Sequence, residues 1–181
     1  RIPAGAGTDA MENYASLRGP VGLNRVFVKA GPTLDHERFL AGLEAGRTFA
    51  TNGPLLGFTL QGKEPGDEIR LGGPATLEAA VSLRSIVPID KLEIVANGEV
   101  VANVPPSGDR TAATQTVKIK VEQSGWYTLR ASAEGSRSPV LDIYPFATTS
   151  PIYVTVADHP VRNPADARYF MAWIDRLLAA A

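Results

Sequence analysis

Cysteine is absent from the 181 residues, and histidine occurs only twice. Without cysteine the chain forms neither disulfides nor thiolate metal sites. The absence is neutral about the cellular compartment, because large extracytoplasmic bacterial domains often manage without disulfides. A secreted or periplasmic location is nevertheless favoured over a cytoplasmic one.

The chain also lacks an excess of either charge and any long apolar run. Its formal net charge is −1, so no basic surplus is available to neutralise phosphates and nucleic acid is not an expected partner. No apolar run reaches the roughly 20 residues that cross a bilayer, so no membrane span is expected. With 44% hydrophobic and 20% charged residues, the composition predicts a folded globular core.

Motifs of common catalytic sites are missing as well. There is no Gly-x-Ser-x-Gly elbow, no cysteine nucleophile, no phosphate-binding glycine loop followed by Lys, and no helix with paired histidines. His36 and His159 lie far apart in sequence, and each fits a solvated surface residue. We therefore expect no catalytic residues and no cofactor in this chain alone.

From residue 49 to 158 the pattern predicts a mainly β fold. Short alternating runs are separated by turn residues, as in residues 77–84, and Asn97-Gly98 suits a type I′ hairpin turn. In residues 125–131, Tyr127 stands two positions before Leu129, as in the tyrosine corner of immunoglobulin-like folds. About seven strands are counted, which predicts an immunoglobulin-like antiparallel β-sandwich.

Helices are predicted on both sides of this region. A short strand at 23–29 precedes a helix at 35–45, which Asp35 caps at its start and Gly46 ends. A second helix begins after Asn163 with Pro164 at its first position. Its apolar stripe is expected to pack on the sandwich or on the first helix, with a missing partner domain as the alternative; the stripe is Phe170, Trp173, Ile174, Leu177 and Leu178.

These elements predict three regions: 1–48, a loop, strand and helix; 49–158, the sandwich; and 159–181, the C-terminal helix. Residues 1–22 are rich in Gly and Ala and show no period, so an irregular segment is expected there. Because the sequence begins at Arg1 without a Met or a signal segment, we expect the natural polypeptide to start further upstream.

Three stretches carry a resemblance to a known family. They are AGTDAMENYASLRGPVGLNRVFV, GLEAGRTFATNGPLLGFTLQGKEPGDEI and DKLEIVANGEVV. Together they resemble the end of metal-dependent hydrolases of the PHP superfamily, in the CehA/McbA (carbaryl-hydrolase-like) group. The resemblance implies an upstream barrel domain that holds divalent metal (zinc, manganese or iron) through His, Asp and Glu, followed by a β-rich region.

The resemblance also implies roles for individual residues. Asp9 would be the last metal ligand of the barrel in the complete enzyme, and the strand at 23–29 and the helix at 35–45 would close that barrel. Met11 stands where the family commonly has a second ligand, a His. Asn13, Arg18 and Asn52 are candidates for positions near the substrate.

Two functions from different classes follow. In the first, the chain is an accessory β-sandwich fragment of a metal-dependent hydrolase, not competent alone, whose partner is the missing N-terminal barrel domain of the same polypeptide. A compatible reading is that the sandwich covers the barrel and orders its last loop. In the second, the chain is a non-catalytic binding module that recognises a glycan, a peptide or a protein.

Overall fold

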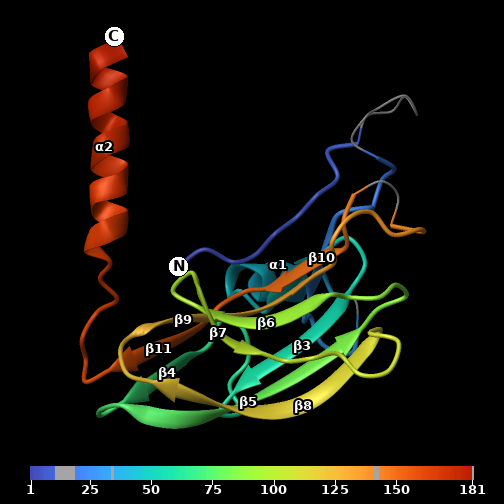
Figure 1. Cartoon of the computed structure of the whole chain (residues 1–181), viewed down its shortest axis with the longest axis horizontal. Coiled ribbons are helices and arrows are strands. Elements are labelled where there is room, and N and C mark those ends of the chain that lie inside the picture. The colour runs from blue at the N-terminus through green and yellow to red at the C-terminus, as the bar shows by residue number, and fades with distance from the viewer. Residues whose placement is uncertain (11–18, 34, 141–142, 181) are drawn as a thin grey trace.

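The computed structural model describes residues 1–10, 19–33, 35–140 and 143–180, which form eleven strands and two helices (Figure 1). The strands are β1 (Arg25–Val28), β2 (Thr48–Thr51), β3 (Leu55–Leu60), β4 (Glu68–Leu71), β5 (Ala75–Arg84), β6 (Lys91–Ala96), β7 (Glu99–Asn103), β8 (Ala112–Val121), β9 (Gly125–Ser132), β10 (Phe146–Thr149) and β11 (Ile152–Val156). The helices are α1 (His36–Glu44) and α2 (Pro164–Ala180).

Two sheets of unequal width form a β-sandwich, which confirms the predicted mainly β class. In the larger, eight-stranded sheet, β9 pairs with β6 on one side and with both β10 and β11 on the other. From β10 this sheet continues through β2 to β1, from β11 it continues to β4, and β7 flanks β6. The smaller sheet has the order β3-β5-β8.

Two details of the sheets differ from the sequence prediction. In the described part of residues 48–156 there are ten strands, β2 to β11, instead of about seven. The pair β4–β11 is parallel, whereas every other strand pair in the described residues is antiparallel. Short strands have too few residues to show the period of two that marks a strand, which is why the sequence pattern did not separate them.

The core confirms the predicted alternation of inward and outward residues. Every second side chain of β5, β9 and β11 is buried between the sheets: Leu77, Ala79, Val81 and Leu83; Tyr127, Leu129 and Ala131; and Ile152, Val154 and Val156. Burial raises the pKa of the Tyr127 phenol, because loss of solvent disfavours the charged form. The period of two in the sequence therefore reports the burial of one strand face.

The local turn and cap signals are also confirmed. Asn97 and Gly98 adopt positive φ values of 51° and 91° between β6 and β7, as a type I′ turn requires. The Asn97 side chain also accepts a hydrogen bond from the Trp126 N–H at 3.1 Å, which ties the hairpin to β9. Asp35 caps α1 by accepting from the Arg38 N–H at 2.9 Å, and Asn163 accepts from the Ala165 N–H at 3.0 Å.

The strand that precedes residue 48 joins the larger sheet, and the helix packs against this strand. β1 pairs with β2 along its whole length, with Phe27 opposite Phe49, so the boundary expected at residue 48 falls inside a continuous sheet. α1 packs against β1 through Gly42, where a Cβ atom would lie 2.7 Å from a Val28 methyl carbon. Only glycine allows the helix to approach the strand this closely.

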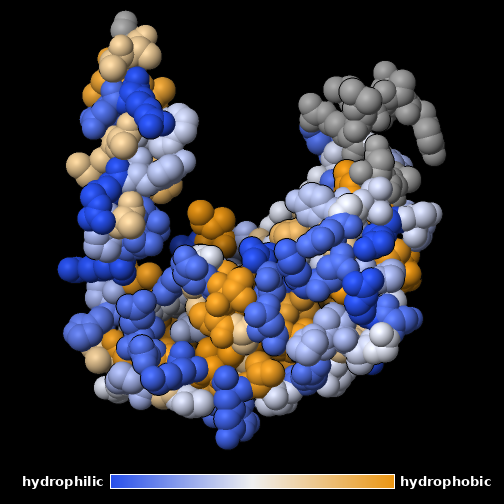
Figure 2. All heavy atoms as spheres, viewed as in Figure 1, coloured by the Kyte–Doolittle hydropathy of each residue, from blue (hydrophilic) through white to orange (hydrophobic). Residues whose placement is uncertain are grey.

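The prediction that α2 packs on the sandwich or on α1 is wrong for this structure. None of its residues is buried, and the side chains of Phe170 and Leu177 remain 64% and 65% exposed. The helix projects away from the sheets, with hydrophobic atoms on its surface (Figures 1 and 2). Ala157 and Asp158 adopt positive φ values directly after β11, and this turn leads the chain away from the core.

No helix in the described part of the chain is both long and apolar enough to cross a membrane.

Because α2 contributes nothing to the buried core, deleting residues 161–181 should leave the free energy of unfolding of the sandwich within about 0.5 kcal/mol of the intact chain. The measurement is urea unfolding followed by Trp126 fluorescence, with the full-length Trp173→Phe variant as reference. A loss above about 2 kcal/mol would show that α2 packs on the sandwich in solution.

Candidate functional site

The N-terminal segment, residues 1–10, has no regular structure but is fastened to the sandwich by a ring of hydrogen bonds. The Ala4 N–H donates to the Ser150 hydroxyl at 2.7 Å, and the Thr48 hydroxyl donates to the Ala4 carbonyl at 2.7 Å. The two hydroxyl oxygens are 2.6 Å apart. Since each hydroxyl has one proton, Ser150 donates to Thr48, and the ring closes with every group used.

This ring is enclosed by the protein. Thr48 and Ser150 are 3% and 0% exposed, and they come from the start of β2 and the residue after β10. Hydrogen bonds shielded from water are stronger than exposed ones, and members of a closed chain polarise one another. Both the N–H and the carbonyl of Ala4 are thereby hydrogen-bonded, although the segment is irregular.

Two further residues, Arg1 and Thr8, fix the segment near its ends. Thr8 binds the backbone of Asn24 twice: its hydroxyl donates to the carbonyl at 3.2 Å and accepts from the N–H at 3.0 Å. Arg1 pairs with Glu68 at 2.9 Å and lies over the Tyr153 ring. The Arg1 guanidinium, followed by the Thr155 hydroxyl, holds the pKa of the Glu68 carboxyl below its usual range. The expected irregular conformation is confirmed for the described part, but the segment is well anchored.

Asp9, the candidate metal ligand, follows directly after the Thr8 anchor. Its side chain is exposed, and its φ of 53° is in the left-handed region, which Asp tolerates better than most residues. Among the described residues, no group of three or more His, Cys, Asp or Glu side chains is close enough to hold a metal ion. Hydrolytic zinc sites take three protein ligands, so the described residues alone do not fit such a site.

Asn52, a candidate for a position near the substrate, has a structural role in the described residues. It is 8% exposed, its amide nitrogen donates to the Tyr144 carbonyl at 2.8 Å, and its amide oxygen accepts from the Phe146 N–H at 2.8 Å. Both ends of the amide are therefore used to hold the chain entering β10 against the end of β2. Asn13 and Arg18, the other two candidates, lie outside the described residues.

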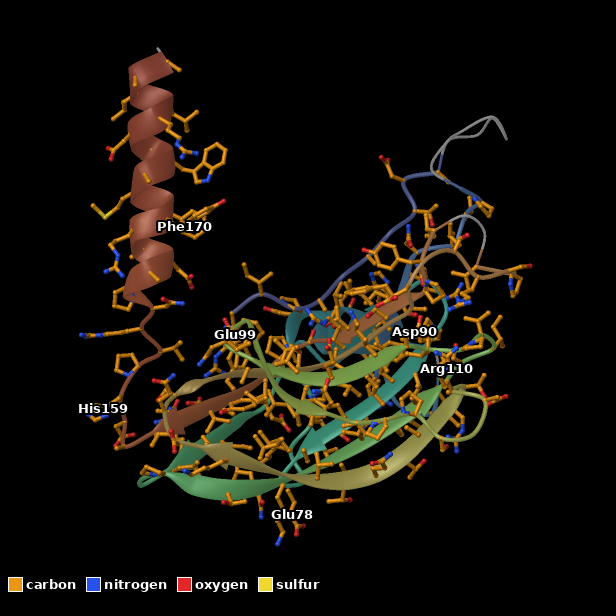
Figure 3. All side chains as sticks on the ribbon, in the orientation of Figure 1. Glu78, Asp90, Glu99, Arg110, His159 and Phe170 are labelled. Atoms are coloured by element: carbon orange, nitrogen blue, oxygen red, sulfur yellow. The ribbon has the colours of Figure 1, made fainter. Side chains whose placement is uncertain are left out.

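A cluster of charges joins three loops at one end of the sandwich (Figure 3). The Asp90 carboxylate accepts from the Glu134 N–H at 2.6 Å and pairs with Arg110 at 2.5 Å and Arg137 at 3.4 Å. The Glu134 backbone bond, followed by the two guanidinium groups, holds the pKa of Asp90 below its usual range. These contacts satisfy the carboxylate from three sides, so the cluster is structural.

A groove of about 410 Å³ lies between the β1–β2 ribbon and β3. Its lining is mostly apolar and includes Phe27, Phe49 and Phe58, with Lys29, Arg47 and Glu64 among its polar residues. The rings of Phe27 and Phe49 are stacked with centroids 4.9 Å apart. Sequence analysis missed this groove, because it depends on which strands end up at the sheet edges.

The fold and the anchored segment define a mainly β, two-sheet sandwich domain that carries an ordered N-terminal arm. No family model, curated protein or solved structure matches the chain.

Ser150→Ala tests the hydrogen-bonded ring, because it leaves the Ala4 N–H without its acceptor. We expect a loss of about 1–3 kcal/mol in the free energy of unfolding and exchange of the Ala4 amide proton at least about tenfold faster. Amide exchange by NMR and urea unfolding measure the two effects, with the exposed Ser136→Ala as the matched control. Unchanged exchange at Ala4 would contradict the ring.

Asp90→Asn should lower the free energy of unfolding at neutral pH by about 1 kcal/mol, since its partners are partly exposed. A carboxylate with a depressed pKa stabilises the fold above its unfolded-state pKa, and this contribution is lost as pH falls through the folded-state pKa. The difference between variant and wild type should therefore shrink in acid. Urea unfolding from pH 7 to pH 2 measures it, and the more exposed Asp158→Asn serves as control; a constant difference would contradict the assignment.

Proposed function

We propose that this chain is the accessory β-sandwich of a PHP-type metal-dependent hydrolase, and that it orders the segment carrying the last metal ligand, Asp9. The chain is not catalytic by itself. The observation that carries the proposal is the anchored arm. Side chains of the sandwich hold residues 1–10 at Arg1 and Ala4, the Thr8 hydroxyl binds the backbone of Asn24 just before β1, and Asp9 follows the last of these anchors.

The physical benefit is preorganisation. Fixing the backbone of one residue costs about 1–2 kcal/mol in conformational entropy, so a free loop would have to be ordered each time it bound a metal. Here the sandwich has already ordered the approach to Asp9. A ligand held in place before binding raises metal affinity and keeps the site geometry constant.

The remaining ligands would come from the barrel domain of the same polypeptide. In such enzymes a bound divalent metal lowers the pKa of a water molecule and makes it a nucleophile at neutral pH. The contribution of this chain is one carboxylate and its position. Small esters, amides and phosphates are the substrate classes that metal-activated water hydrolyses.

The test is metal analysis of the full-length polypeptide. Asp9→Asn should lower the bound metal per chain and reduce hydrolysis of ester or phosphate substrates by at least about a hundredfold, in the range of changes that disturb metal sites. Asp175→Asn on α2 removes the same charge far from the arm and should leave both unchanged. Full metal content in the Asp9 variant would disprove the ligand role.

Ser150→Ala in the same full-length polypeptide separates ordering from ligation. It leaves the carboxylate in place but releases the arm, so metal should be lost faster to a chelator while activity at saturating metal is largely retained. Dissociation rates measured with a chromophoric chelator give the comparison, with Ser136→Ala as control. Identical rates would show that the sandwich does not order the ligand segment.

A non-catalytic binding module is the second candidate, and the groove beside β3 is the observation that favours it. The groove is mostly apolar and lined by consecutive residues of one strand, which suits an extended peptide better than a glycan.

A further inference from the structure

β3 differs from the other edge strands of the sandwich in carrying no charge. In the described residues five strands lie at sheet edges: β1, β3, β4, β7 and β8. Four of them carry charged side chains, namely Arg25 in β1, Glu68 and Arg70 in β4, Glu99 in β7, and Lys118 and Lys120 in β8. Charges on edge strands oppose pairing with other chains. β3, with the sequence Leu-Leu-Gly-Phe-Thr-Leu, has no such protection.

The register of β3 shows which backbone groups face the open edge. The Gln61 N–H donates to the Glu78 carbonyl on β5 at 2.7 Å, so these two residues form a hydrogen-bonded pair. Hydrogen-bonded and non-hydrogen-bonded pairs alternate along an antiparallel ladder. In the recorded register, Leu56 lies opposite Leu83 and Phe58 opposite Val81. Both are therefore non-hydrogen-bonded pairs, and the N–H and C=O groups of Leu56 and Phe58 point away from β5 into the groove.

The larger sheet extends beyond this edge and covers the space next to it. β3 packs against β10, and the larger sheet continues from β10 through β2 to β1, while the smaller sheet stops at β3. Two strands therefore extend past β3, with the stacked Phe27 and Phe49 rings lining the space beneath. Strands pair about 4.8 Å apart and sheets pack about 10 Å apart, so one added strand fits next to β3.

One end of the groove is positively charged. Lys29 follows β1 and Arg47 precedes β2, and the Lys29 N–H donates a hydrogen bond to the Arg47 carbonyl at 2.9 Å. Both residues line the groove. Glu64 pairs with Lys29 across this end at 2.5 Å. Among the described residues no carboxylate pairs with Arg47, so one cationic side chain is left uncompensated beside the apolar space.

We propose that β3 is a docking edge for an extended segment of another polypeptide, which adds as an antiparallel strand beneath β1 and β2. Its alternate side chains are apolar and contact Phe27 and Phe49, and an acidic side chain near its amino end meets Arg47. Main-chain bonds to Leu56 and Phe58 supply affinity, and the apolar and cationic contacts supply specificity, as in other cases of strand addition. This inference rests on the binding-module candidate, which it deepens, and does not depend on the hydrolase proposal.

A second copy of this chain is a poorer occupant. If two β3 strands paired edge to edge, the β1–β2 ribbon of each copy would extend over the β3 of the other, and the two ribbons would compete for the same space. A single extended segment carries no such ribbon and therefore meets no such obstacle.

The probe is an acetylated, amidated peptide of sequence Asp-Thr-Val-Thr-Val-Thr-Val, titrated into the labelled intact chain. The amide signals of Leu56 and Phe58 should shift on binding, and their exchange with solvent should slow. In the proposed register the valine N–H groups face β3 and the central threonine N–H groups face solvent. N-methylation of the first and second valines of the peptide should therefore weaken binding at least about tenfold. N-methylation of its second and third threonines should not.

Protein variants test the charged end without touching the core. Arg47→Glu should weaken binding about fivefold or more, and replacing the peptide Asp with Lys should restore part of the loss. Lys118→Glu, with the same charge change on the β8 edge, should bind as wild type does. Equal effects of the two N-methylations, no shift at Leu56 and Phe58, amides already protected without peptide, or a stable dimer of the free chain by sedimentation would each overturn the proposal.

Discussion

The unequal width of the two sheets is the constraint on which the rest of this structure depends. Three strands face a sheet of eight, so the smaller sheet covers only part of the larger. Where it covers, alternate side chains of both sheets exclude water and supply the stability of the fold. Where it stops, at β3, the described residues cover the inner face of the β1–β2 ribbon only in part, and both the groove and its aromatic lining result from that mismatch.

The same ribbon also carries the N-terminal arm. Thr48 opens β2 and closes the ring around Ala4 with Ser150, and Asn24, which binds Thr8, lies just before β1. Side chains on β1 and β2 line the groove, while residues at their ends hold the arm. Any change that shifts this ribbon would therefore affect the arm and the groove together, which links the two proposed roles through one structural element.

Much of the local structure could be predicted from the sequence, because its causes lie within a few residues. Alternation placed Leu77 to Leu83 on the buried face of β5, the Asn97-Gly98 turn placed a hairpin, and Asp35 and Asn163 marked helix starts. Each depends on a period or on a backbone preference that a short window contains. The apolar stripe of α2 was equally visible, but a stripe does not name its partner, and here α2 contacts no core.

Tertiary structure alone decided the edges, the pairings and the roles of polar residues. The parallel pairing of β4 with β11 joins segments more than 80 residues apart, and no local pattern encodes it. From the sequence Asn52 is only a polar loop residue, but in the fold its side-chain amide bonds the backbone of Tyr144 and Phe146 and holds the two segments together. The sequence by itself determined the longer strands, their buried faces, the hairpin turn and the helix starts. The distant pairings determined which backbone groups remain open, because hydrogen-bond satisfaction depends on what each strand finally lies beside.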